Sequence, residues 1–115
     1  MQKVALFAFN GELMCFVHVL LNALDMKENG MDPTIVFEGA SVKLVEQLAN
    51  ESNPFHGLYT QAKEQELIEG ACKACSAKLG AVEAVQAEGL PLLDGVKGHP
   101  AMREYMEKGY QILTF

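Results

Sequence analysis

Two cysteine thiols, one helical turn apart, follow a short apolar run that has the length of a buried strand. The run covers residues 67–71, Cys72 comes directly after it, and Cys75 lies in a helix-like segment that ends at Gly80. The first N–H groups of a helix have no partner inside the helix and carry a partial positive charge. A thiolate is stabilised there, so we expect the pKa of Cys72 to fall below the ordinary value of about 8.5. The spacing therefore predicts sulfur chemistry, with Cys72 and Cys75 as the candidate catalytic thiols.

Three kinds of chemistry are open to this pair of thiols. Cys72 can act as a nucleophile or carry a persulfide, and the two cysteines can form a redox disulfide, as paired cysteines at helix starts do. They can also supply two metal ligands, but a structural zinc site needs four ligands and the chain has no second paired-cysteine motif. We therefore predict no metal site and no cofactor. In the alternative reading, the protein is a small oligomeric binding module whose cysteines hold a metal or only pack in the core.

Four further residues are candidate binding residues. Asn10 and Gly11 follow the first apolar run, where backbone amides can bind an anion. Cys15 comes shortly afterwards and is expected at the same edge of the fold as Cys72. Lys73 places a positive charge beside Cys72, and a nearby cation lowers the pKa of a thiol. The histidines are expected to be structural: His18, His56 and His99, of which His99 is expected to cap the last helix before Pro100.

Length and composition limit the classes of protein to consider. The chain has 115 residues, of which 50% are apolar, and we expect one domain over residues 1–115. A net charge of −6, with no basic run, argues against a nucleic-acid partner. The apolar stretch 13–24 is shorter than the roughly 20 residues of a membrane span, and the apolar start is too short for a signal peptide. Three cysteines, an odd number, do not make a disulfide framework, so we expect a cytoplasmic protein with reduced thiols.

Strands and helices alternate along the sequence. The pattern predicts strands at 3–9, 34–37, 67–71 and 110–115, with a turn at Asp32-Pro33 and a strand or extended loop at 90–93. It predicts helices at 12–28, at 41–50 with Ser41 as cap, from Asn53-Pro54 onward, at 72–80, at 81–88 and at 99–108. This alternation is typical of an α/β fold in three layers, α/β/α, with a mostly parallel sheet of about five strands. Ligands of such folds bind beyond the carboxyl ends of the strands, where Cys72 is expected.

The helix at 12–28 is apolar on more than one face. Its main apolar stripe has helical spacing and comprises Leu13, Phe16, Val17, Leu20, Leu21 and Leu24. Other apolar residues lie off that stripe: Met14, Val19, Ala23 and Met26. We expect the second face to be deeply buried or to contact another subunit.

The chain resembles the DsrE/DsrF-like family, which includes the sulfur-relay subunits of the TusD type. The resemblance spans nearly the whole chain: a first strand ending at Asn10-Gly11, a long apolar helix, a helix opened by Asn53-Pro54-Phe55, and a last strand after Glu107-Lys-Gly-Tyr. Its most specific part is the strand that leads to Cys72 in Ala-Cys-Lys-Ala-Cys-Ser-Ala-Lys-Leu-Gly.

This resemblance implies a flavodoxin-like or Rossmann-like fold and a homo-oligomer, either a trimer or a hexamer. In the relay members, the matching cysteine accepts sulfane sulfur as a persulfide and passes it to the next protein. Carried over to this chain, that cysteine is Cys72, and the implied partners are a sulfur donor and a sulfur acceptor protein. Cys75 is not required of a simple carrier, and it can instead resolve the persulfide, releasing sulfide and leaving a disulfide.

Overall fold

Five parallel strands form one open sheet in the order β4-β3-β2-β1-β5. The computed structural model describes all residues from 1 to 115. The strands are β1 (Lys3–Ala8), β2 (Asp32–Phe37), β3 (Ile68–Cys72), β4 (Leu92–Leu93) and β5 (Tyr110–Thr114). Every neighbouring pair is parallel, which confirms the predicted sheet and its five strands. The segment at 90–93 does form a strand, but only two of its residues pair with β3.

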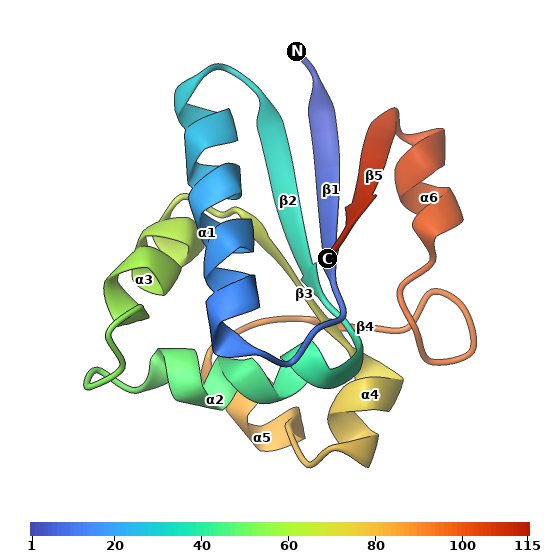
Figure 1. Cartoon of the computed structure of the whole chain (residues 1–115). Coiled ribbons are helices and arrows are strands. Elements are labelled where there is room, and N and C mark those ends of the chain that lie inside the picture. The colour runs from blue at the N-terminus through green and yellow to red at the C-terminus, as the bar shows by residue number, and fades with distance from the viewer.

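Helices cover both faces of the sheet and its carboxyl end. They are α1 (Leu13–Glu28), the 3₁₀ helix η1 (Gly39–Lys43), α2 (Leu44–Ala49), α3 (His56–Glu64), α4 (Lys73–Lys78), α5 (Val82–Ala87) and α6 (Met102–Glu107). α1 and α3 lie on one side of the sheet and α6 lies beside β5 on the other, while α2, α4 and α5 lie beyond the strand ends (Figure 1). This is the expected three-layer, Rossmann-like α/β fold. No helix is both long and apolar enough to cross a membrane.

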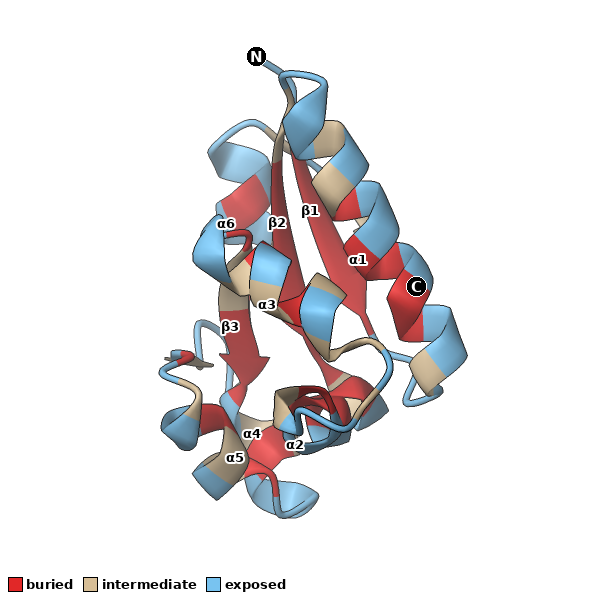
Figure 2. Ribbon diagram, turned by 90° about the vertical axis from the view of Figure 1, so that its left-hand side faces the viewer, coloured by how far each residue is buried: buried red, intermediate tan, exposed pale blue.

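The two faces of the sheet bury cores of different size. Alternate residues of β1 point to opposite faces. Val4, Leu6 and Ala8 join the large core under α1, α2, α3 and α5, whereas Ala5 and Phe7 pack with Tyr105 of α6. Figure 2 shows β1 and β2 buried beyond their first residues, and the outer face of α1 exposed. In the large core, the rings of Phe16 and Phe37 stack with their centroids 4.7 Å apart, which fixes α1 on β2.

The second strand starts two residues earlier than the sequence pattern predicts. Asp32-Pro33 was expected to be a turn, but Pro33 lies inside β2, opposite Val4 of β1. Proline has no N–H to donate, so it is tolerated only where no neighbouring strand needs that donor. The N–H of Ile35 points to β3 and donates to the carbonyl of Leu67. The nitrogen of Pro33, two residues earlier in the same strand, faces the same side. β3 begins to pair only at Ile35, so the missing donor of Pro33 costs no hydrogen bond.

Three helix starts differ from the predicted ones. Ser41 is not a cap: Glu38 is the N-cap of η1, and Ser41 completes a capping box from the third position. The Oδ1 atom of Asn53 accepts a hydrogen bond from the N–H of Phe55, which makes a turn, and α3 starts at His56. His99 does not cap the last helix, because the chain turns at Val96–His99 and α6 starts only at Met102.

The buried face of α1 is rotated from the predicted stripe. Val19 and Ala23 are fully buried, whereas Leu21 is 46% exposed and Met14 is 63% exposed. Val19, Leu20 and Ala23 share one side of the helix at the spacing of three and four residues, and that side packs on the sheet. Leu21 lies beyond it and faces outward together with Met14. The helix therefore has a second apolar face that the chain itself does not cover.

The close approach of β3 and β4 gives a stability prediction. A side chain at Gly70 would collide with the carbonyl oxygen of Pro91 and lie 3.1 Å from Cγ of Leu93, so Gly70→Ala must push the two strands apart. We expect it to lower the free energy of unfolding by about 2 kcal/mol or more, measured by denaturant titration. Gly57→Ala on α3 is the control, because nothing lies within 4 Å of its new methyl group, and it is expected to stabilise by up to about 1 kcal/mol. Equal effects of both changes would contradict the predicted collision.

Candidate thiol site

Cys72 ends β3 and caps the helix that follows. Its Sγ atom accepts a hydrogen bond from the N–H of Cys75 at 3.4 Å, in the place that a side-chain oxygen takes in an ordinary N-cap. The backbone therefore holds the sulfur at the start of α4, as the sequence predicts. Because α4 has only six residues, its dipole is short and the direct N–H contact is the main local source of positive potential at the sulfur.

A turn after β4 places a histidine over this sulfur. The N–H of Ala74 has no partner inside α4 and donates to the carbonyl of Gly98 at 2.8 Å. Val96 and His99 exchange two backbone hydrogen bonds, at 2.7 and 2.9 Å, which closes the turn. Gly98 has a φ of +86°, and a methyl group there would lie 3.2 Å from Cβ of Ala74. The turn therefore needs a glycine at this position, and it places His99 beside Cys72.

Cys72, Cys75 and His99 form one cluster, which we call the Cys–Cys–His cluster. The Nδ1 atom of His99 lies 3.1 Å from Sγ of Cys72 and 3.9 Å from Sγ of Cys75. All three ligand atoms lie within 4.8 Å of one another. Sγ of Cys72 also lies 3.7 Å from the carbonyl oxygen of Gly98, to which the thiol can donate. A cysteine–histidine contact of this length permits direct proton transfer between sulfur and imidazole.

A carboxylate from the neighbouring strand lies beside the same nitrogen. Glu38 follows β2 directly, and its Oε1 atom is 3.4 Å from Nδ1 of His99. Its backbone is fixed by Ser41, whose hydroxyl accepts from the N–H of Glu38 at 3.1 Å and lies 2.6 Å from the carbonyl oxygen of Ala8. Burial raises the pKa of Glu38, and the attraction of His99 opposes that rise. The carboxylate can therefore stabilise a protonated His99 ring.

The environment of Cys72 corrects the expected shift of its pKa. Burial raises the pKa of this thiol to about 11, and the hydrogen bond from the N–H of Cys75 offsets only part of that rise. The expectation of a lowered pKa was therefore wrong, because burial disfavours the charged sulfur more than the short helix stabilises it. At neutral pH Cys72 is a thiol, and a base must take its proton before the sulfur can attack. His99 is the base within reach.

Access to the cluster is uneven. Cys72 has no exposed surface, Cys75 is half-buried, and 43% of the side chain of His99 is exposed. The Gly98–His99 segment covers the sulfur of Cys72, so a reagent reaches that atom only if the segment moves. Cys75 and His99 form the outer side of the cluster.

The predicted binding residues lie outside the cluster. Cys15 is exposed on α1 and is not among the clustered ligands. Lys73 forms an exposed ion pair with Asp94 at 3.5 Å, so its charge is shared with that carboxylate. Asn10 and Gly11 shape the backbone: Oδ1 of Asn10 accepts from the N–H of Glu12 at 2.7 Å, and a methyl group at Gly11 would lie 2.9 Å from Cβ of Ala40.

Sequence reasoning missed two members of the site, His99 and Glu38. Both follow strands that neighbour β3, since Glu38 comes directly after β2 and His99 comes after the short β4. The carboxyl ends of adjacent parallel strands lie at one edge of the sheet. Polar residues after strands 34–37 and 90–93 were therefore the signal that could have found them.

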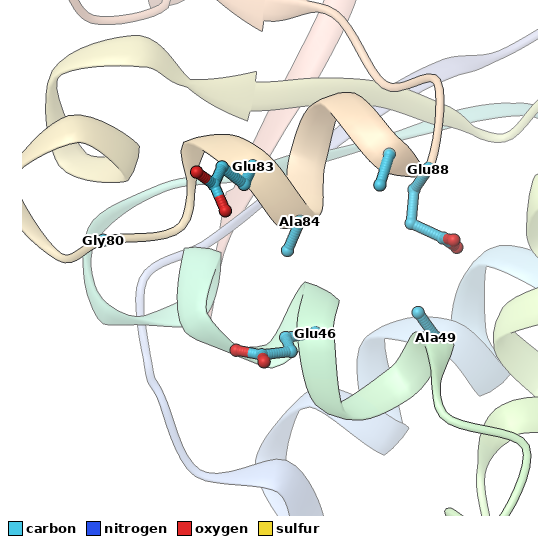
Figure 3. A pocket seen from close by; sticks show the side chains of 7 residues that line it. Glu46, Ala49, Gly80, Glu83, Ala84 and Glu88 are labelled. Carbon is cyan, nitrogen blue, oxygen red and sulfur yellow. The ribbon is translucent and has the colours of Figure 1, made fainter.

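A separate hollow lies between α2 and α5. It has a volume of about 360 Å³ and is lined by Glu46, Ala49, Gly80, Glu83, Ala84, Ala87 and Glu88. Figure 3 shows carboxylates and alanine methyl groups facing each other across it. Its lining contains no thiol, imidazole or hydroxyl, whereas the Cys–Cys–His cluster brings two thiols and an imidazole together. The cluster is therefore the stronger candidate for a reactive site.

The turn that carries His99 gives a prediction about access. Gly98→Ala places a side chain in the left-handed region, at a cost of about 1–2 kcal/mol, and pushes against Ala74. We expect the turn to open and Cys72 to be alkylated about tenfold faster, because local opening exposes its sulfur. Mass spectrometry of timed alkylation gives the rate for each cysteine. Gly89→Ala is the matched control, because Gly89 also has a positive φ, +71°, and nothing lies within 4 Å of the added methyl group. It should leave the alkylation rate of Cys72 unchanged. An unchanged rate in Gly98→Ala would contradict the covering role of the turn.

Comparison with known proteins identifies two relatives. No family model matches the chain. An uncharacterized protein of Methanocaldococcus jannaschii is 28% identical over 97 residues, which cover 84% of this chain and 77% of that protein. A solved structure of a conserved protein of unknown function from Bacteroides thetaiotaomicron is similar with a TM-score of 0.68 and 25% identity, over 99% of this chain and 95% of that one. The fold is thus shared over the full chain with a solved structure, and the function is to be inferred from the Cys–Cys–His cluster.

Proposed function

We propose that the protein is a cytoplasmic sulfur carrier that accepts sulfane sulfur on Cys72 as a persulfide and passes it to the thiol of a partner protein. The observation that carries the proposal is the 3.1 Å contact between Sγ of Cys72 and Nδ1 of His99, at a sulfur that also accepts an N–H from Cys75. The imidazole of His99 can thus take the proton of the Cys72 thiol, and the fixed N–H of Cys75 stabilises the thiolate that results. The resemblance of the chain to DsrE/DsrF-like proteins supports the same chemistry.

The transfer consists of two exchange steps. His99 takes the proton of the Cys72 thiol, and the thiolate attacks the outer sulfur of a donor persulfide, R–S–SH. The S–S bond of the donor breaks, the donor leaves as a thiolate that takes up a proton, and Cys72 holds the outer sulfur as Cys72–S–SH. An acceptor thiolate then attacks that outer sulfur and returns Cys72 to its thiolate. No net oxidation occurs, so the cycle needs no redox cofactor.

The surroundings of Cys72 suit a carrier. Thiol exchange depends on thiolate fraction and access, and both are low while the Gly98–His99 turn covers the sulfur. Burial that disfavours the free thiolate also keeps stray thiols away from a bound persulfide. The Glu38 carboxylate, 3.4 Å from Nδ1, favours the imidazolium that forms when the thiol loses its proton. Loading and unloading then occur only while the turn is open, and a partner protein that opens the turn would speed both.

Cys75 gives this carrier a second possible outcome. Its thiolate can attack the inner sulfur of the Cys72 persulfide, which expels HS⁻ and leaves a Cys72–Cys75 disulfide. Cys75 is the more exposed of the two thiols and lies within the same 4.8 Å cluster. In a carrier this reaction must be slower than transfer to the acceptor. In a dithiol redox protein it would dominate.

We further propose that the carrier is a homo-oligomer, a trimer or a hexamer. α1 presents the outward apolar residues Met14 and Leu21, which are 63% and 46% exposed. A second copy of the chain would cover this face, and the resemblance to DsrE/DsrF-like proteins implies a trimer or a hexamer.

Intact mass tests the carrier reaction. We expect the reduced, chelator-treated protein to gain one sulfur atom when it is incubated with a low-molecular-weight persulfide donor. Cys72→Ser should gain none, and His99→Ala should load about tenfold more slowly at neutral pH, because the base is lost. Cys15→Ser is the matched control, since that exposed thiol lies outside the cluster, and it should load like the parent protein.

Two results of this experiment would refute the carrier function. Full loading of Cys72→Ser would place the sulfur elsewhere, and no loading of the parent protein would leave Cys72 as a packing residue. Cys75→Ser separates the two fates of the persulfide. A carrier holds its added sulfur with or without Cys75, whereas a redox protein holds it only in Cys75→Ser and otherwise forms the disulfide.

Light scattering coupled to size exclusion tests the assembly. We expect the mass of three or six chains, and we expect Leu21→Glu to reduce it because the charge would be buried at the interface. Glu83→Gln on α5 is a control surface substitution that should not change the mass. A monomeric mass for the parent protein would contradict the proposed assembly.

A further inference from the structure

We propose that the Cys–Cys–His cluster is a zinc site in which Cys72, Cys75 and His99 bind one Zn²⁺ ion and a fourth position stays open. This inference goes beyond sulfur transfer and does not depend on it. The three residues come from two segments, α4 with its cap and the turn after β4, and their ligand atoms already lie within 4.8 Å of one another. The sequence alone suggested only two ligands, because His99 was assigned to a helix cap.

The two sulfur–nitrogen distances are close to the corresponding edges of a tetrahedral zinc site. With Zn–S bonds of about 2.3 Å and Zn–N bonds of about 2.0–2.1 Å, a sulfur and a nitrogen on one tetrahedral zinc ion lie about 3.6 Å apart. Nδ1 of His99 lies 3.1 Å from Sγ of Cys72 and 3.9 Å from Sγ of Cys75, on either side of that value. Shifts of about half an ångström or less would bring both sulfur–nitrogen edges to the tetrahedral length. The ring is already turned with Nδ1, and not Nε2, toward both sulfurs.

The chemistry of the ligand set selects zinc among the divalent cations. Thiolate and imidazole ligands suit Zn²⁺, whereas Mg²⁺ and Ca²⁺ require oxygen ligands. Coordination deprotonates a thiol outright, so two thiolates balance the charge of the ion. Three protein ligands are typical of zinc sites that keep one position for water or a substrate, and Cys₂His is one such set.

The groups around the cluster support its ligands. The N–H of Cys75 donates to Sγ of Cys72, and Gly98 is tied to α4 through the N–H of Ala74, so both sides of the site are held by backbone. Oε1 of Glu38 lies 3.4 Å from the ligating nitrogen, close enough to accept a hydrogen bond from water at the open position. Such outer groups commonly change metal affinity by about 10–100-fold. An ion would enter from the side of Cys75 and His99, which are less buried than Cys72.

Metal and sulfane sulfur would use the same atom, Sγ of Cys72. A Cys72 thiolate that donates a lone pair to Zn²⁺ is a weaker nucleophile toward a persulfide, so the zinc-bound protein would be a closed state of the carrier. The two proposals remain separable. Metal affinity is measured without any persulfide, and sulfur loading is measured after treatment with a chelator.

Cobalt and zinc titrations test the site. The reduced, chelator-treated protein is titrated with CoCl₂, and we expect one Co²⁺ per chain, with thiolate charge-transfer bands and the strong visible bands of tetrahedral cobalt. Competition with a chromophoric chelator then gives the affinity for Zn²⁺. Cys75→Ser and His99→Ala should each weaken it by at least about tenfold, and Glu38→Gln should weaken it by about 10–100-fold. Cys15→Ser and His18→Ala change a cysteine and a histidine outside the cluster and should leave it unchanged.

Alkylation of the unmodified protein provides a test that needs no variant. Bound Zn²⁺ should protect Cys72 and Cys75 from alkylation and leave the exposed Cys15 as reactive as before. The proposal is overturned if the parent protein binds no stoichiometric Co²⁺ or Zn²⁺, if tight binding survives in both Cys75→Ser and His99→Ala, or if added Zn²⁺ protects none of the clustered thiols.

Discussion

The hydrogen bond from the N–H of Ala74 to the carbonyl of Gly98 is the constraint on which the site depends. The start of α4 leaves backbone donors without partners inside the helix. Cys72 satisfies one of them with its sulfur, and Gly98 satisfies the next with its carbonyl. The N–H groups at the start of α4 thus tie the turn after β4 to that helix and bring His99 to the sulfur of Cys72. The same contacts that cap the helix assemble the chemistry.

The sheet order explains why residues distant in sequence meet here. Glu38, Cys72 and His99 lie at or just after the carboxyl ends of β2, β3 and β4, and these strands are neighbours in the order β4-β3-β2. Because all the strands are parallel, their ends share one edge. Ser41 fixes the β2 end through the carbonyl of Ala8 on β1, so four adjacent strands contribute to the geometry of one site.

The sequence predicted the fold and the place of Cys72 in it, because both follow from local patterns. Apolar runs gave the parallel strands, and Cys72 was correctly placed where a strand meets a helix. The remaining features depend on tertiary contacts. His99 precedes a proline and has the pattern of a helix cap, and only the contact between the turn and α4 directs it to the thiols. Pro33 fits a strand because β3 starts late, and the raised pKa of Cys72 follows from burial that no local pattern records.

The sulfur of Cys72 is at once a reactive atom and a structural cap, and these roles are thermodynamically linked. α4 is short and has few internal hydrogen bonds, so the contact from the N–H of Cys75 to Sγ is a sizeable part of what holds its first turn. A sulfur with more negative charge is a better acceptor. By linkage, the free energy with which the hydrogen bond stabilises the thiolate equals the free energy with which the thiolate stabilises the turn. The amide proton of Cys75 is consequently a built-in reporter, whose resonance follows the chemical state of the sulfur it touches.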